Sequence, residues 1–161
     1  MLANSRIRMF AVVAACVFLI DLSTKVVAVN TLSVNRPVSL LDGLLTLRLT
    51  RNPGAAFSFG TGYTVVLSVL AIGVAVAVVR LSSRLGSLVW AVALGLLLGG
   101  ACGNLTDRLL RDPGPFRGRV VDFVELPNWP IFNAADSAIV LGACLIVLQA
   151  VRGVHLDGSH S

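Results

Sequence analysis

Charged residues are scarce in this sequence. Only 13% of its 161 residues are Asp, Glu, Lys or Arg, whereas soluble domains carry about 25%. Hydrophobic residues make up 56%, and the mean hydropathy is +0.87. A chain with so little polar surface cannot cover itself in water, so we expect lipid to be its solvent. The net charge of +5 comes from scattered basic residues without an aromatic-interleaved groove, which argues against a nucleic-acid partner.

Cysteine and histidine are also scarce, and their positions exclude several kinds of site. Cys16, Cys102 and Cys144 all lie inside apolar runs, and an odd number of such cysteines argues against a disulfide framework. His155 and His160 lie together in the polar tail. No Ser–His or Cys–His pair is therefore available for nucleophilic hydrolysis, and we expect neither a metal site nor a cofactor.

Four long apolar stretches are present. A spanning helix needs about 20 mostly apolar residues, and residues 9–29, 63–79, 88–105 and 131–151 approach this length. Backbone inside a bilayer must satisfy its own hydrogen bonds, so these stretches are expected to be helices. The sequence predicts a membrane all-α fold, a bundle of four transmembrane helices within a single integral membrane domain, residues 1–161.

The segment at residues 34–58 has a different pattern. Residues 45–50 alternate apolar and polar side chains, as a half-buried strand does. Residues 42–43 are Asp-Gly, a hairpin-turn signal, and residues 38–41 can supply the partner strand. We therefore predict a surface β region at about 34–58, with a small sheet of two or three strands. Residues 120–124 are predicted as an apolar patch within a loop.

The polar residues gather on one side of the membrane. Four spans place both termini on one side, and the loops at 30–62 and 106–130 on the other. Nothing in four independent hydrophobic helices requires this convergence, and ionisable groups at membrane depth by default mark a functional site. The residues that converge are Asp21, Lys25, Asn52, Asn104, Asp107, Arg108, Asp122, Asn133 and Asp136.

With nucleophilic pairs and metal sites excluded, carboxylates are the groups that remain as candidates for acid–base catalysis. Two close carboxylates share a proton, so one can activate water while the other protonates a carbonyl oxygen. Asp122 lies among the apolar residues 120–124, which would raise its pKa. Asp136 follows Ala134 and Ala135 in the first turn of a span, where the helix N-terminus favours its charged form and lipid burial its neutral form. These two acids are the predicted catalytic pair.

The other two aspartates have basic neighbours. Asp21 is followed by Lys25 and Asp107 by Arg111, each four residues later, which is the spacing of a helical ion pair. An aspartate held by a cation stays ionised and is a poor proton shuttle. We therefore predict structural or positioning roles for Asp21, Lys25 and Asp107.

The third apolar stretch carries a row of glycines and has a polar pair at its end. Asn104 and Arg108 share a helix face, where they can bind a lipid phosphate or a peptide carbonyl, unless Arg108 only reaches toward the interface. Gly95, Gly99 and Gly103 form a ridge of small residues, which favours close helix packing and would aim the following Asp107 at the bundle interior.

Five ordered motifs between Asp21 and Ser137 resemble those of the bacterial lipoprotein signal peptidase family, also called signal peptidase II. None is specific alone, but five in order on four spans are a strong signal. They are Asp21-Leu-Ser-Thr-Lys25, Arg51-Asn-Pro-Gly-Ala-Ala-Phe-Ser58, Gly99-Gly-Ala-Cys-Gly-Asn-Leu-Thr-Asp-Arg108, Val120-Val-Asp-Phe123 and Phe132-Asn-Ala-Ala-Asp-Ser137.

The resemblance implies an intramembrane aspartic endopeptidase that cuts prolipoproteins just before a diacylglyceryl-modified cysteine. The family's catalytic aspartates match Asp122 and Asp136. Its polar residues lining the site match Asn52, Asn104, Arg108 and Asn133. The connection from Asp122 to Asp136 is short for the family.

The resemblance also implies a location. The enzyme would be a multi-pass protein of the bacterial cytoplasmic membrane, with the active site and the small sheet on the outer side and both termini in the cytoplasm. The positive-inside rule weakly disfavours this orientation, because more basic residues lie on the side of the loops than on the side of the termini. Arg6 and Arg8, however, favour a cytoplasmic N-terminus. Residues 54–59, beginning with Gly54, are a candidate lid on the membrane. Membrane lipids are expected partners, and we expect a monomer.

Two other functions fit parts of the sequence. Val13-Ala-Ala-Cys16 resembles a lipobox, but the apolar run before it is short and continues to Ile20, as a span would. A small transporter or proton channel could use the aspartates as a relay. Carriers usually place such groups near mid-membrane, whereas here they gather at one interface.

Overall fold

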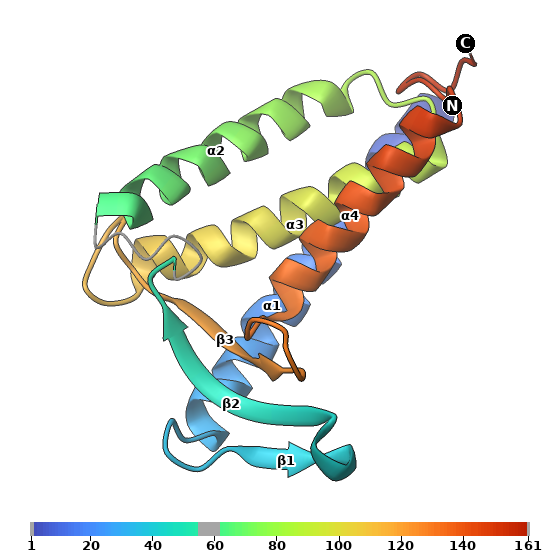
Figure 1. Cartoon of the computed structure of the whole chain (residues 1–161). Coiled ribbons are helices and arrows are strands. Elements are labelled where there is room, and N and C mark those ends of the chain that lie inside the picture. The colour runs from blue at the N-terminus through green and yellow to red at the C-terminus, as the bar shows by residue number, and fades with distance from the viewer. Residues whose placement is uncertain (1, 55–61, 161) are drawn as a thin grey trace.

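The computed structural model describes residues 2–54 and 62–160. This part of the chain contains four helices long and apolar enough to span a membrane and one small antiparallel sheet, which confirms the predicted fold class (Figure 1). Most of the proposed lid, residues 55–59, lies outside the described residues. The elements are α1 (Leu2–Thr31), β1 (Val38–Leu40), η1 (Leu41–Gly43), β2 (Leu45–Asn52), α2 (Gly62–Ser82), α3 (Leu88–Leu110), β3 (Val120–Glu125) and α4 (Ala134–Val151).

Helix α3 is the centre of the bundle. It packs along α1, along α4 and along α2, whereas α1 and α4 touch each other less. Figure 1 shows α2 diverging from α4, with both chain ends at one end of the bundle and the sheet at the opposite end. The sheet therefore lies beside the last turns of α1 and α3 and the first turn of α4.

Near the sheet, two helices end or begin at other residues than the apolar stretches predicted. Helix α3 continues to Leu110, beyond the predicted end at residue 105, because its polar last turns are buried against α1 and the sheet: Asn104 is 7% exposed and Asp107 is 2% exposed. Helix α4 begins at Ala134 rather than at residue 131. Asn133 is its N-cap, in a reciprocal capping box with Asp136.

The sheet has the order β1-β2-β3, with both pairs antiparallel. The predicted hairpin is present, with Val38 opposite Leu47 and Leu40 opposite Leu45. Its turn uses positive φ angles at Leu41, Asp42 and Gly43, a conformation that Asp and Gly tolerate and that leucine rarely adopts. The prediction that residues 120–124 form a loop is wrong: β3 pairs with β2, and Asp122 lies opposite Thr50.

The glycine ridge of α3 is packed against α1. A Cβ atom on Gly95 would lie 2.9 Å from the carbonyl oxygen of Phe10, and one on Gly99 would lie 2.6 Å from that of Ala14. A Cβ on Gly103 would lie 2.4 Å from Oδ2 of Asp21. Close approach of the two helices therefore depends on hydrogen atoms at these positions, and it brings Asp21 against α3.

We predict that Gly99→Ala destabilises the bundle by about 1–3 kcal/mol, because the added methyl group forces α1 and α3 apart. Gly73→Ala is the matched control, since a Cβ on Gly73 in α2 meets nothing within 4 Å. Thermal unfolding in detergent micelles measures both. Equal midpoints for the two variants would contradict the packing role of Gly99.

Candidate functional site

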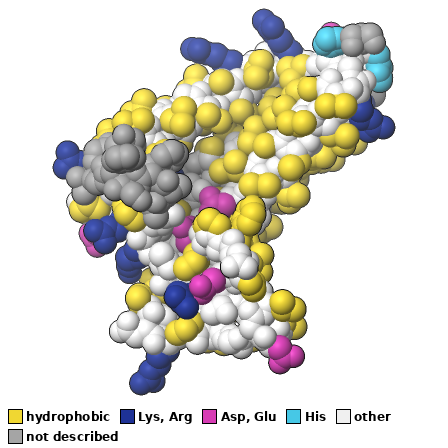
Figure 2. All heavy atoms as spheres, in the orientation of Figure 1, with side chains coloured by type: hydrophobic (Ala, Val, Ile, Leu, Met, Phe, Trp, Pro, Cys, Tyr) yellow, Lys and Arg dark blue, Asp and Glu magenta, His cyan; other side chains and the backbone are white. Residues whose placement is uncertain are grey.

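A buried polar cluster lies where the sheet meets the ends of α1, α3 and α4. Figure 2 shows acidic side chains in the hollowed waist between the helical part and the sheet. Most members of the cluster are almost inaccessible, which is rare for charged groups unless they are paired. The buried members are Asp21, Lys25, Asn104, Asp107, Asp122 and Asn133, none more than 7% exposed.

Lys25 of α1 is at the centre of this cluster. Its Nζ atom lies 2.7 Å from Oδ2 of Asp21 and 2.9 Å from Oδ2 of Asp107. It also donates to Oδ1 of Asn104 at 2.9 Å. Three different acceptors thus surround a cation that is 1% exposed. The sequence predicted only the pair with Asp21, because the partners on α3 are about 80 residues away along the chain.

Asp21 and Asp107 attach the next elements to the cluster. The backbone N–H of Ala135, in the first turn of α4, donates to Oδ1 of Asp21 at 2.9 Å. The backbone N–H of Val121 in β3 donates to Oδ2 of Asp107 at 3.1 Å, and Arg111 pairs with the other oxygen. The two acids therefore fix β3 and the start of α4, which are the elements that carry Asp122 and Asp136.

A tight reversal of the chain brings β3 next to the start of α4. The backbone of Phe132 pairs with Val124, with N–O distances of 2.9 Å in both directions. This places Asn133 beside Asp122. The Asn133 side chain donates to Oδ1 of Asp122 at 2.7 Å, and its backbone N–H donates to Oδ2 of Asp136 at 3.2 Å. One residue therefore hydrogen-bonds to both carboxylates.

Two further asparagines hold the same carboxylates from other elements. Asn52, at the end of β2, donates to Oδ2 of Asp122 at 2.8 Å. Asn104 donates to Oδ1 of Asp136 at 2.7 Å. The oxygen of Asn104 accepts from Lys25, so its amide nitrogen must face Asp136. Gly54 lies next to this network, because its N–H donates to the oxygen of Asn52 at 2.8 Å.

The environment of Asp122 raises its pKa above that of a free aspartate. Burial raises its pKa to about 6, and the negative charge of Asp136 contributes in the same direction. The hydrogen bonds from Asn52 and Asn133 and the positive charge of Lys25 act against this increase. A carboxyl group with this pKa exchanges its proton near neutral pH, which suits a general acid or base.

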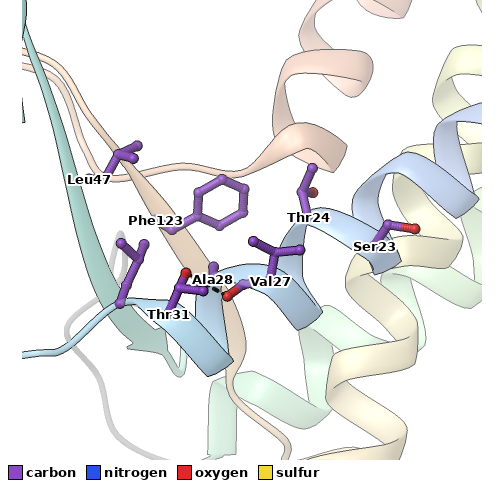
Figure 3. Close-up of a pocket in the computed structure, with 8 residues that line it drawn as sticks. Ser23, Thr24, Val27, Ala28, Thr31, Leu47 and Phe123 are labelled. Carbon is purple, nitrogen blue, oxygen red and sulfur yellow. Dashed lines mark hydrogen bonds between the residues drawn. The ribbon is translucent and has the colours of Figure 1, made fainter.

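Strand β3 presents its two faces to different surroundings. Asp122 faces the polar cluster, whereas the next residue, Phe123, points into an apolar pocket of about 270 Å³ between α1 and the sheet (Figure 3). Val27 and Ala28 of α1 and Leu47 of β2 line this pocket. Because successive side chains of a strand alternate in direction, the Phe123 contact fixes the side on which Asp122 lies.

Asp136 is reached from two grooves on either side of α4. The interhelix groove, about 290 Å³, is lined by apolar residues of α2, α3 and α4 and by Asn104, Arg108 and Asp136. The α4 groove, about 370 Å³, is lined by Leu126, Trp129, Phe132, Asp136, Ser137, Val140 and Leu141. Arg108 is thus the cation that shares a groove with Asp136, and its Nη1 donates to the Asn104 carbonyl at 3.3 Å.

The structure brings all the sequence-predicted polar residues into one region, with Gly54 and Gly103 at its borders. Two backbone contributions were missed, the N–H groups of Val121 and Ala135, because no side-chain pattern reveals them. Within residues 2–54 and 62–160, no group of three or more His, Cys, Asp or Glu side chains is arranged to hold a metal ion. The arrangement can move a proton between two carboxyl groups and a bound molecule.

Comparison with known proteins gives a consistent result. The family model described as signal peptidase (SPase) II matches residues 13–152. A lipoprotein signal peptidase of Rhodococcus jostii is 51% identical over 148 residues, covering 92% of this chain and 75% of that protein. One of Mycobacterium tuberculosis is 49% identical over 152 residues, covering 94% and 75%.

Two solved structures have the same fold. Both are described as bacterial membrane enzymes, determined by the in meso method at 1.9 and 2.3 Å resolution. The first has a TM-score of 0.79 at 29% identity and covers 89% of this chain and 92% of its own. The second has a TM-score of 0.78 at 29% identity and covers 88% and 87%.

Proposed function

Since the chain belongs to the signal peptidase II family, and is therefore a membrane peptidase of lipoprotein processing, we propose that it is an aspartic endopeptidase that cuts diacylglyceryl-modified prolipoproteins just before the lipidated cysteine. Asp122 and Asp136 are the proposed catalytic pair. The observation that carries this proposal is the pair of carboxylates joined through Asn133, one on a strand and one at a helix start.

The proposed reaction starts with one proton on the pair. Asp122 keeps it, because its pKa is raised by burial and by the charge of Asp136. Asp136 removes a proton from a water molecule, which attacks the carbonyl carbon before the cysteine, and Asp122 protonates the carbonyl oxygen. As the tetrahedral intermediate collapses, the C–N bond breaks, Asp136 passes its proton to the leaving cysteine nitrogen, and one hydroxyl group of the intermediate returns its proton to Asp122. The new carboxyl group remains on the signal peptide.

The remaining polar residues have positioning and binding roles in this proposal. Asn52, Asn104 and Asn133 were predicted to bind substrate, and their amide groups now contact the two carboxylates, so we assign them to orienting these acids. Arg108 is left as the substrate-binding residue, suited to a peptide carbonyl of the substrate in the interhelix groove. Asp21, Lys25 and Asp107 hold the elements that carry the pair.

The proposal includes the location. We place the protein in the bacterial cytoplasmic membrane, with the sheet and the acid pair on the outer side and both termini in the cytoplasm. A prolipoprotein with a lipidated cysteine keeps its scissile bond near that interface, where water and lipid meet. Single cysteines are introduced at Ser39 or Ser83 after Cys16, Cys102 and Cys144 are replaced with alanine. A membrane-impermeant thiol reagent added to whole cells should label position 39 and not position 83.

The assay for the proposed function uses purified full-length protein and a diacylglyceryl-modified prolipoprotein peptide. Mass spectrometry should find one cut, immediately before the modified cysteine. The same peptide without the lipid should be cleaved far more slowly. Absence of cleavage, or a cut elsewhere, would overturn the proposed function.

The assignment of the proton to Asp122 predicts a pH dependence. The active form carries the proton, so kcat/KM should be high below about pH 6 and should fall as the pH rises through this value. Asn52 donates to the ionised carboxylate and thereby lowers its pKa. Asn52→Ala should therefore raise the pKa and move the falling limb upward by about one pH unit.

Asn35→Ala is the control, because Asn35 is exposed and distant from the pair in the chain. It should leave the profile unchanged. If kcat/KM instead rises with pH through 6, Asp122 must act ionised and the two aspartates exchange roles.

A further inference from the structure

Two hollows adjoin each other on the side of the chain reversal between β3 and α4. The first is the α4 groove described above, which ends at Asp136. The second, here called the outer hollow, measures about 610 Å³ and includes Thr46 and Glu125 of the sheet and Asn128 of the reversal. Leu126 and Trp129 line both hollows. Trp129 therefore stands at the point where the two hollows meet.

The two hollows differ in character. The walls of the α4 groove are apolar and open outward, since Val140, Leu141 and Trp129 are 56%, 58% and 62% exposed. In a protein whose helices span a bilayer, these side chains face acyl chains. The outer hollow mixes polar and apolar groups, and Glu125 in its wall pairs with Arg48 at 3.0 Å. One hollow suits lipid and the adjacent one suits polypeptide in water.

Over the described part of the chain, the interhelix groove does not adjoin the outer hollow. Its walls are Leu67, Leu70, Ala71 and Val74 of α2 with residues of α3 and α4, and it shares no residue with the outer hollow. It reaches Asp136 from the opposite side of α4. As far as the described residues line it, this groove can therefore receive one apolar segment that ends at the acid pair.

A lipidated prolipoprotein has a matching asymmetry around its scissile bond. The residues before the bond belong to one apolar signal helix. The cysteine after the bond is the single point from which both acyl chains and a water-exposed polypeptide depart. Among the residues that the structure describes, the α4 groove, which Asp136 lines, and the outer hollow offer lipid-facing and water-facing space side by side, joined at Leu126 and Trp129.

We propose, on the basis of the function proposed above, that the α4 groove receives the acyl chains of the modified cysteine and that the outer hollow receives the first residues of the mature lipoprotein. The signal helix then occupies the interhelix groove. Trp129 is a specificity-determining residue at the branch point. The lipoprotein product and the signal peptide thus leave from opposite sides of α4.

The test compares two substrates with the same peptide. One carries a dipalmitoylglyceryl cysteine, and the other carries a diacetylglyceryl cysteine, which keeps the glyceryl esters but lacks the long chains. Val140→Trp fills the α4 groove, and should lower kcat/KM for the dipalmitoyl substrate by at least about tenfold, as expected for a steric misfit in an apolar pocket. The diacetyl substrate should be affected much less.

Two other variants serve as controls. Val147→Trp lies two turns further along the same face of α4, is 61% exposed and is outside the groove, so neither substrate should be affected. Ala71→Trp obstructs the interhelix groove and should slow both substrates alike, because they share one signal helix. Equal slowing of both substrates by Val140→Trp would overturn the proposal.

Photocrosslinking gives an answer even where a tryptophan variant fails to fold. The full-length Asp122→Asn protein is mixed with a substrate that carries a diazirine within one acyl chain. Label on Trp129, Val140 or Leu141 is expected, and label on residues 67–74 of α2 would overturn the proposal. If wild-type protein cuts the dipalmitoyl substrate but the label lies on α2, the proposed function stands and only this inference fails.

Discussion

Replacing either Asp122 or Asp136 with asparagine is expected to reduce cleavage of a diacylglyceryl-modified peptide by about 10²–10⁴-fold, the range for loss of a general acid or base. Asparagine keeps the volume of aspartate and can still accept the hydrogen bonds from Asn133. It cannot take up or release the proton that the reaction needs. The fold should therefore survive while the chemistry does not, and a cleavage assay with thermal unfolding on the same samples measures both.

Asp112→Asn is the matched control, because Asp112 is exposed in the connection after α3. It should retain wild-type cleavage and the wild-type unfolding midpoint. Because the pair acts as a unit, the double variant should be scarcely slower than either single one. A double variant that cleaves at the wild-type rate would end the assignment of the pair.

The fold could be predicted from the sequence where hydrophobicity alone decides. Four apolar stretches of spanning length leave no alternative to helices in a bilayer, and the Asp-Gly turn signals the hairpin. Strand β3 was missed because Val120–Val124 is a short apolar run without alternation, which periodicity cannot distinguish from a buried loop. Its partner strand lies about 70 residues earlier in the chain, so only tertiary structure reveals the pairing.

The sequence predicted which residues make up the site, but not the hydrogen bonds and ion pairs that connect them. Topology alone placed the aspartates, the asparagines and Lys25 at one end of the bundle. The sequence did not show that Asn133 is both the N-cap of α4 and a donor to Asp122, because the predicted helix began at residue 131. It also did not show Lys25 between α1 and α3, since local spacing reveals only partners on the same helix. The roles of Asp122 and Asp136 stay predictions until variants are assayed.

Lys25→Met is expected to destabilise the protein by about 3–5 kcal/mol, the usual cost of removing one partner from a buried ion pair. Methionine has a similar length, so the main loss is the charge. Without Lys25, Asp21 keeps only the N–H of Ala135 among the contacts described here, and Asp107 keeps Arg111 and the N–H of Val121. The carboxylate of Asp21 then lies buried at 0% exposure without a cation.

This variant should also lose activity, because Asp21 and Asp107 hold the elements that carry the acid pair. Thermal unfolding in micelles measures the stability, with Arg80→Met, an exposed cation at the end of α2, as the control that should change little. The decisive variant adds Asp21→Asn to Lys25→Met. If the unpaired charge causes the loss, the double variant should be more stable than Lys25→Met alone. A double variant that is less stable would show that Lys25 acts through packing, and that the buried charges do not hold α1, α3 and α4 together.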